Sequence, residues 1–168
     1  MLDMLGPLGH GFVPNSASRN LLLIAGGIGI APLVALAERG MAEGLQVTLL
    51  LGAPTQAQLY PANLLPPQAR VLLATEDGTA GIRGMVTDLV AGLVREADQI
   101  FACGPTSMYK AMASQGAQIL EGKSVQISLE ARMGCGMGYC YGCSVETKRG
   151  LKQICKDGPV FDLHDIFR

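Results

Sequence analysis

The fold of this chain is decided by the stretch Asn20-Leu-Leu-Leu-Ile-Ala-Gly-Gly-Ile-Gly-Ile-Ala-Pro32. Its apolar run, residues 21–25, has the length of a buried strand and leads directly into a glycine turn. The residues that follow have the composition of a helix. A strand, a glycine turn and a helix in this order begin a parallel sheet wound with helices. The glycines and Pro32 make the same stretch a poor membrane span, so no contact with a membrane is expected.

The same alternation continues to about residue 130. Apolar runs predict strands at residues 21–25, 46–51, 70–75, 99–103 and 124–129, and helix-like spacing predicts helices at residues 31–42, 85–96 and 105–120. The connection 60–67 contains three prolines and is expected to be irregular. We therefore predict an α/β fold with an open parallel-sheet nucleotide-binding domain at residues 19–130. A small, loop-rich module is expected to follow at residues 131–168.

Length and charge restrict the partners. The chain has 168 residues, enough for one ordinary domain and a small appendage. Lys and Arg number 13 against 14 Asp and Glu, and charged residues make up only 16%. This balance suits neither a nucleic-acid binder nor an acidic disordered tail, which leaves small molecules or other proteins as partners. The N-terminus lacks the basic start and apolar core of a secretory signal, so the chain is expected to be cytoplasmic.

Four of the five cysteines lie in the last quarter of the sequence. Cys135, Cys140, Cys143 and Cys155 form C-x4-C-x2-C with a more distant fourth cysteine, a spacing typical of plant-type [2Fe–2S] proteins. Each iron of such a cluster takes two thiolates, so the two irons need four cysteines. One glycine-rich loop can supply three of these ligands, and Cys155 can supply the fourth. Structural zinc and unliganded buried thiols are the alternatives. Cys103 stands apart and could simply pack in the core.

The glycine turn after the first strand is a candidate phosphate site. Gly26, Gly27 and Gly29 precede a helix whose N-terminal N–H groups could receive a pyrophosphate. The turn departs from the Rossmann fingerprint, because Pro32 stands where the third glycine of G-x-G-x-x-G would be. A simple tight turn is the alternative.

Two further motifs follow strands and should meet this turn at the same edge of the sheet. Glu76 and Asp77 follow the third strand, where a carboxylate could bind a ribose hydroxyl or simply cap a polar turn. Gly104 and Pro105 follow the fourth strand, which ends at Cys103. Because three such turns converge, the sequence predicts a nucleotide site at this edge.

Together these motifs resemble a known family. Residues 26–32, 74–78 and 103–105, in that order, look like the pyridine-nucleotide domain of the ferredoxin-NADP reductase superfamily. The sequence Ser128-Leu-Glu-Ala-Arg-Met-Gly-Cys-Gly136 continues through Cys140 and Cys143 to Cys155-Lys-Asp-Gly-Pro-Val-Phe161. It narrows the resemblance to the electron-transfer subunits of NAD-dependent, B-type dihydroorotate dehydrogenases.

The resemblance implies a role in pyrimidine biosynthesis. Electrons would pass between NAD(H), FAD and a [2Fe–2S] cluster on this subunit and FMN on a catalytic partner that oxidises dihydroorotate, within a hetero-oligomer. It implies nucleotide binding by Gly26, Gly27, Gly29, Pro32, Gly104 and Pro105, a nicotinamide near Cys103, and cluster ligation by Cys135, Cys140, Cys143 and Cys155. Glu76 and Asp77 stand where NADP-using relatives carry phosphate-binding residues, which favours NAD.

Family members carry an N-terminal β-barrel that holds most of the FAD. Residues 1–18, with Gly6-Pro-Leu-Gly-His-Gly-Phe12, look like the end of that barrel or a linker, so a fragment or a shortened subunit is expected. FAD would then bind in the full-length or assembled protein. Related subunits serve NADPH:ferredoxin reductases, sulfide dehydrogenases and hydrogenases, which remain alternatives. A non-catalytic, zinc-stapled nucleotide-binding module is a more distant one.

Overall fold

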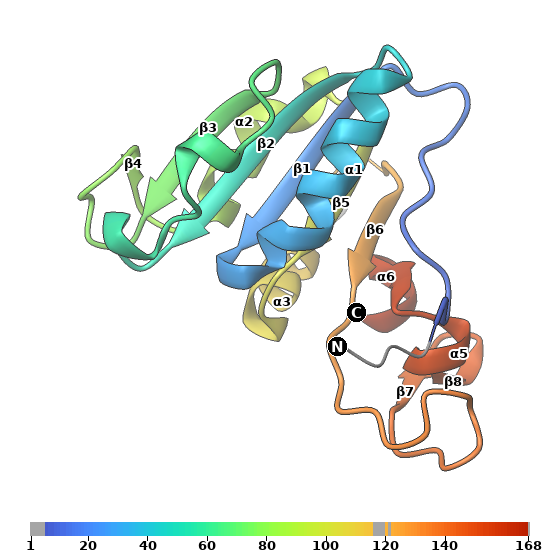
Figure 1. Ribbon diagram of the computed structural model, residues 1–168. Coiled ribbons are helices and arrows are strands. Elements are labelled where there is room, and N and C mark those ends of the chain that lie inside the picture. The colour runs from blue at the N-terminus through green and yellow to red at the C-terminus, as the bar shows by residue number, and fades with distance from the viewer. Residues whose placement is uncertain (1–5, 116–119, 121, 168) are drawn as a thin grey trace, which may run out of the picture.

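The computed structural model describes residues 6–115, 120 and 122–167. Its largest element is a seven-stranded sheet in the order β4-β3-β2-β1-β5-β6-β9 (Figure 1). The strands are β1 (Asn20–Gly26), β2 (Gln46–Ala53), β3 (Arg70–Thr75), β4 (Ile82–Arg83), β5 (Gln99–Cys103), β6 (Val125–Ser128) and β9 (Val160–Asp162). Neighbouring strands from β4 to β6 are parallel, whereas β9 pairs with β6 antiparallel. The α/β fold with a mostly parallel sheet is therefore confirmed.

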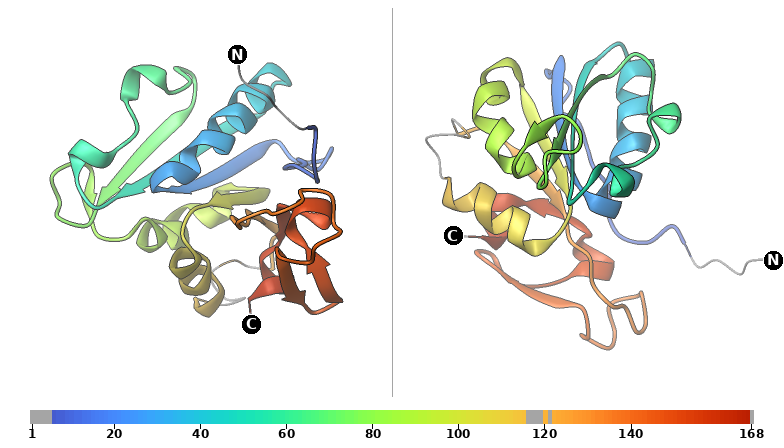
Figure 2. Two further views of the ribbon diagram at one scale, coloured as in Figure 1. Left: turned by 60° about the horizontal axis from the view of Figure 1, so that its bottom comes forward. Right: turned by 90° about the vertical axis from the view of Figure 1, so that its left-hand side faces the viewer.

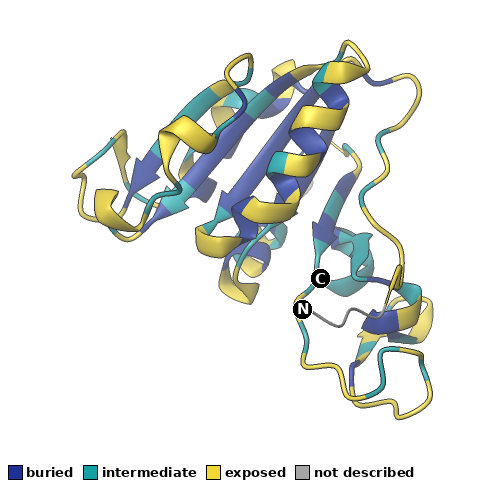
Figure 3. Cartoon of the chain, in the orientation of Figure 1, coloured by how far each residue is buried: buried dark blue, intermediate teal, exposed yellow. Residues whose placement is uncertain are grey.

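Helices cover both faces of the sheet (Figure 2). On one face, α1 (Ile30–Ala42) packs Leu33 and Ala37 against the side chains of β1 and β2. On the other, the short α2 (Val90–Leu93) and α3 (Thr106–Ser114) contribute Val90 and Met112 to a second core. Strands covered on both faces are apolar throughout, which explains the continuous run that begins the sheet. Figure 3 shows these strands as the most buried part of the molecule.

The predicted strands are confirmed to within two residues, but one predicted helix is wrong. Residues 85–96 form two 3-10 turns, Val86–Leu89 and Val94–Glu96, on either side of the single helical turn α2. Gly92 and the β-branched residues of this segment disfavour a continuous helix. The helix predicted at 105–120 is α3, which begins at Thr106 and ends at Ser114. Residues 116–119 of that prediction lie outside the described residues.

The C-terminal region packs against the end of β6. Strands β7 (Ser144–Thr147) and β8 (Gly150–Gln153) form an antiparallel hairpin, followed by α5 (Ile154–Asp157), β9 and α6 (Leu163–Ile166). The Leu129 N–H donates to the Pro159 carbonyl at 2.8 Å, beside the β6–β9 pairing. The module is therefore continuous with the large sheet, a connection that its sequence does not reveal.

Residues 9–18 form an extended segment, here called the N-terminal strap, that crosses from the module to the sheet (Figure 1). The His10 N–H donates to the Gly158 carbonyl, and His10 forms an isolated bridge with Pro159. Farther along, the Val13 N–H donates to Gln126 Oε1 at 3.0 Å in β6. The strap therefore contacts both parts of the structure. None of the helices in the described residues is long and apolar enough to cross a bilayer.

Candidate functional site

A cleft of ≈ 700 Å³ opens at the carboxyl ends of the parallel strands. It lies where the strand order turns back between β1 and β5, the position at which open α/β sheets bind ligands. Its lining comes from the turns that follow β1, β2, β3, β5 and β6, and from the segment before α2. The predicted residues Gly26, Gly27, Gly29, Pro32, Glu76, Cys103, Gly104 and Pro105 all line it.

Glycines let the turns after β1 and β5 approach each other closely. A Cβ at Gly29 would overlap the Cys103 carbonyl oxygen, and one at Gly26 would lie 2.8 Å from the Pro105 ring. Gly27 differs, because its φ is +55° and a Cβ there would meet open space. The turn at Gly27 therefore has room for a ligand group beside its backbone at the N-terminus of α1, where N–H groups favour an anion. These features suit a nucleotide pyrophosphate.

The two predicted carboxylates lie in different surroundings. Glu76 lines the cleft, whereas Asp77 does not. The Asp77 carboxylate accepts hydrogen bonds from Thr79 Oγ1 at 2.7 Å and from the Thr79 N–H at 2.9 Å. These bonds, led by that from the hydroxyl, lower the pKa of Asp77. The Asp77 carboxylate thus stabilises the turn in which it lies, and Glu76 is the carboxylate available to a bound nucleotide.

Cys103 ends β5 and is partly buried beside the cleft. Burial raises the pKa of its thiol above the usual value, so the thiol is neutral at physiological pH. Behind it lies the fully buried Tyr109, whose phenol pKa is also raised by burial. Sequence analysis did not single out Tyr109, because nothing in its local pattern distinguishes it from an ordinary core aromatic.

Main-chain N–H groups point at the sulfurs of the predicted cluster loop. Cys135 Sγ accepts from the Met137 N–H at 3.4 Å and the Tyr139 N–H at 3.3 Å. Cys140 Sγ accepts from the Gly142 N–H at 3.4 Å. Such bonds stabilise thiolates, and those from Cys140, Met137 and Tyr139 lower the pKa of Cys135 to about 6. The loop itself is largely exposed (Figure 3).

The four cysteines fall into two pairs. The thiol of Cys140 lies close enough to that of Cys135 to influence its pKa, and the thiols of Cys143 and Cys155 lie close enough to influence each other's pKa. The Cys155 N–H donates to Cys143 Sγ at 3.4 Å, which lowers the pKa of Cys143, whereas burial raises that of Cys155. Across the described residues, no three Cys, His, Asp or Glu side chains gather tightly enough to hold one ion. Each iron of a [2Fe–2S] cluster takes two thiolates, so two cysteine pairs match the two irons of such a cluster.

A buried glutamine holds the loop against α5. Gln153 Nε2 donates to the Gly138 carbonyl at 2.8 Å, and the Gln153 N–H donates to Asp157 Oδ2 at 2.8 Å. Gly138 has a φ of +84°, and a Cβ there would lie 2.8 Å from Gln153 Oε1. This glycine therefore lets the loop approach the helix that carries Cys155.

The cleft and the cysteine loop are adjacent. Ala131 and Met133, which precede Cys135 by a few residues, line the cleft, and so does Pro159 beyond Cys155. Glu130 lines both the cleft and a neighbouring hollow of ≈ 360 Å³ that includes Arg132. The candidate nucleotide cleft and the cysteine loop thus share one stretch of chain.

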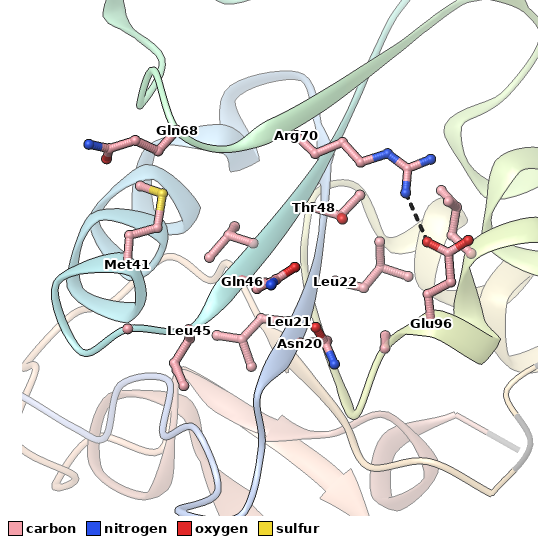
Figure 4. A pocket seen from close by; sticks show the side chains of 14 residues that line it. Asn20, Leu21, Leu22, Met41, Leu45, Gln46, Thr48, Gln68, Arg70 and Glu96 are labelled. Carbon is pink, nitrogen blue, oxygen red and sulfur yellow. Dashed lines mark hydrogen bonds and ion pairs between the residues drawn. The ribbon is translucent and has the colours of Figure 1, made fainter.

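A separate hollow of ≈ 460 Å³ lies at the opposite, amino-terminal edge of the strands (Figure 4). Its polar features include an ion pair at 2.8 Å between Arg70 and Glu96, both more than half exposed. Exposed pairs of this kind contribute little free energy. The hollow is remote from the turns that carry the predicted site residues, so we do not assign it to the site.

This combination of fold and site defines the class: an NAD-binding oxidoreductase domain with an attached iron–sulfur module. The chain belongs to the oxidoreductase NAD-binding domain family, whose model matches residues 23–114. Residues 130–167 match the model of the iron-sulfur cluster binding domain of dihydroorotate dehydrogenase B. An iron–sulfur cluster and NAD are therefore cofactors of this chain, as predicted.

Curated relatives are similar over nearly the whole chain. It is 36% identical over 173 residues to the electron transfer subunit of dihydroorotate dehydrogenase B (NAD(+)) of Bacillus cereus strain G9842, covering 99% of this chain and 65% of that protein. Identity to the same subunit of Shouchella clausii strain KSM-K16 is 38% over 171 residues, covering 98% and 64%. The chain thus spans slightly less than two thirds of the length of these relatives.

Solved structures show the same fold. An NADH-dependent reduced ferredoxin-NADP oxidoreductase, studied for flavin-based electron bifurcation, matches with a TM-score of 0.83 and 34% identity, over 98% of this chain and 59% of that one. A cytochrome P450 reductase from Amycolatopsis matches with a TM-score of 0.52 and 27% identity, over 69% and 38%. Both likenesses support the reductase architecture.

Proposed function

We propose that this chain is the electron-transfer subunit of a B-type dihydroorotate dehydrogenase. It would carry electrons between NAD(H), FAD, a [2Fe–2S] cluster and an FMN-containing catalytic subunit in pyrimidine biosynthesis. The observation that carries the proposal is the stretch 130–133, which leads from the nucleotide cleft into the cysteine loop. Both curated relatives named above bear this function in their names.

Each part of the cleft has a role in this proposal. The Gly27 turn and the N-terminus of α1 would bind the pyrophosphate. Glu76 would accept a hydrogen bond from the adenosine ribose and repel a 2'-phosphate, which selects NAD(H) over NADP(H). Cys103, as a neutral thiol, would position the nicotinamide ring. The two turns bracket the β1–β5 switch point, so they would fix the direction in which the dinucleotide lies.

The two thiolate pairs would hold a [2Fe–2S] cluster, one pair to each iron. Four thiolates supply the negative charge that ferric irons require, and the N–H groups aimed at the sulfurs moderate that charge. A flavin supplies the conversion between a two-electron hydride and the single electrons of the cluster. We propose that the flavin is FAD, bound by the full-length or assembled protein.

The same proposal assigns the parts of the chain. Residues 19–130 would form the nucleotide-binding domain and residues 131–168 the cluster module, with residues 1–18 as a linker or the end of an FAD-binding domain. The chain would act within a hetero-oligomer in the cytoplasm. Residues 131–168 would face the catalytic subunit, because their exposed cysteine loop lets two redox centres approach closely.

Reduction of the cluster by dihydroorotate tests this function directly. The iron-loaded chain is mixed anaerobically with an FMN-containing dihydroorotate dehydrogenase subunit, and visible absorption is followed after adding dihydroorotate. We expect cluster bleaching that requires the partner and that a Cys140→Ser variant lacks. If the partner oxidises dihydroorotate with an artificial acceptor but leaves the cluster oxidised, this function is wrong.

A related reductase subunit is the second candidate, favoured by the TM-score of 0.83 to the NADH-dependent reduced ferredoxin-NADP oxidoreductase. In that case a ferredoxin would exchange electrons with the chain. Reduced ferredoxin would then bleach the cluster in the same assay, whereas dihydroorotate with its dehydrogenase subunit would not.

A further inference from the structure

A tyrosine hydroxyl occupies the fork where β5 and β6 separate. The last pair of the β5–β6 register is Cys103 with Ser128. Beyond this pair, the backbone after β5 turns at Gly104 into α3, whereas the backbone after β6 leads toward the cysteine loop. Tyr109 Oη accepts from the Gly104 N–H at 2.9 Å and donates to the Ser128 carbonyl at 2.6 Å. The hydroxyl therefore bridges the two backbones where the next pair of the ladder would stand.

The ring of Tyr109 is buried, whereas its two hydrogen bonds are partly buried beside the cleft. Tyr109 is 1% exposed, and its ring packs on Phe167 with a centroid separation of 5.9 Å. Removing the hydroxyl would leave a main-chain donor and a main-chain acceptor without the group that links them, so the two backbones could move apart. The ring alone could still fill its place in the core. The hydroxyl and the ring thus have separable roles.

Both backbones that the hydroxyl joins belong to the cleft. Gly104 and Ser128 line it, as does Cys103 immediately before Gly104. We propose that Tyr109 is a positioning residue, which fixes the separation of Gly104 and Ser128 and thereby holds Cys103 toward the nicotinamide. The inference rests on the proposed function, in which this cleft holds NAD(H). Tyr109 itself does not line the cleft, so its effect would pass through Gly104 and Ser128.

Three variants separate hydroxyl from ring. Tyr109→Phe removes the hydroxyl bridge and keeps the ring. Phe167→Leu disturbs the packing of the Tyr109 ring and keeps the bridge. Tyr60→Phe is a control that removes a hydroxyl from a half-buried tyrosine outside the cleft. The dissociation constant for NADH is measured on each iron-loaded chain through the fluorescence of NADH itself. We expect Tyr109→Phe to raise it about three- to tenfold, because a displaced Gly104 turn would weaken nucleotide contacts worth about one hydrogen bond. The other two variants should retain the original affinity, and iron content should stay constant throughout.

Equal NADH affinity of Tyr109→Phe and the original chain would overturn the inference, as would an equal loss in Phe167→Leu. If the original chain itself fails to bind NADH, the proposed nucleotide site fails instead. A second measurement needs no variant: the Gly104 amide should exchange its hydrogen slowly although it lines an open cleft. Exchange at the rate of an unprotected glycine would contradict the bridge.

Discussion

At the scale of single residues, the proposed function gives the five cysteines two distinct roles. Cys140→Ser removes a thiolate from one of the two pairs, and we expect iron content to fall to less than half because the second iron loses its support as well. Cys103→Ala should keep full iron content and slow only hydride transfer in a flavin-containing assembly. Iron and acid-labile sulfide analysis of the purified variants checks this. Equal iron loss in both would contradict the assignment.

The two neighbouring acids provide a second matched comparison. Glu76 lines the cleft, so Glu76→Gln should remove the repulsion of a 2'-phosphate and reduce the preference for NADH over NADPH about three- to tenfold, or ~1 kcal/mol. Asp77→Asn serves as control, because that carboxylate is bound to Thr79. The dissociation constants of both variants for NADH and NADPH test this difference. A larger effect at Asp77 would reverse the two roles.

At the scale of elements, the N-terminal strap contacts Gly158 and Pro159, which directly follow the helix that carries Cys155. Gly9 has a φ of +65°, and a Cβ there would overlap the Gly158 carbonyl oxygen. Gly9→Ala should therefore displace the strap and destabilise the protein by about 1–3 kcal/mol. Gly11→Ala is the control, since a Cβ there meets nothing within 4 Å. Thermal unfolding and the rate of iron loss to a chelator measure the effect. Identical behaviour of Gly9→Ala and Gly11→Ala would show that the strap does not support the module.

Elements were predictable from sequence where their signal is local. Continuous apolar runs identify β1, β2, β3 and β5, because strands covered on both faces cannot expose polar side chains. The helix predicted at residues 85–96 is wrong because apolar residues recur there at helical spacing, whereas Gly92 and three valines disfavour a regular helix. The cysteine spacing and the glycine turns likewise indicated most residues of the candidate site, whose roles stay predictions.

The features of the fold and the candidate site that the sequence did not predict depend on contacts between residues far apart in the chain. His10 meets Pro159, β9 pairs with β6, and the hydroxyl of Tyr109 bridges Gly104 and Ser128. No local pattern encodes these partners, since each depends on how whole elements pack. For the same reason the sequence could not separate Glu76 from Asp77, whose surroundings differ only in the folded chain.

At the scale of the whole molecule, the cluster should stabilise the module much more than the sheet. The cysteine loop and the β7–β8 hairpin have only a small core around Cys143, Ile154 and Cys155, whereas Leu163 of α6 packs into the core of the large sheet. Removal of iron by a chelator should therefore leave the parallel sheet folded while β7 and β8 lose protection from hydrogen exchange. Because β9 pairs with β6, the effect should extend to that edge of the sheet and stop there. Unchanged exchange in the β7–β8 hairpin would contradict this view.

Metal content tests the central claim most directly. The chain is purified without oxygen, and iron, acid-labile sulfide and zinc are measured together with the visible spectrum. We predict a reddish-brown protein with two irons and two sulfides per chain and no stoichiometric zinc, as two thiolate pairs require. A colourless protein with one zinc per chain, which iron and sulfide fail to convert, would contradict an electron-transfer role.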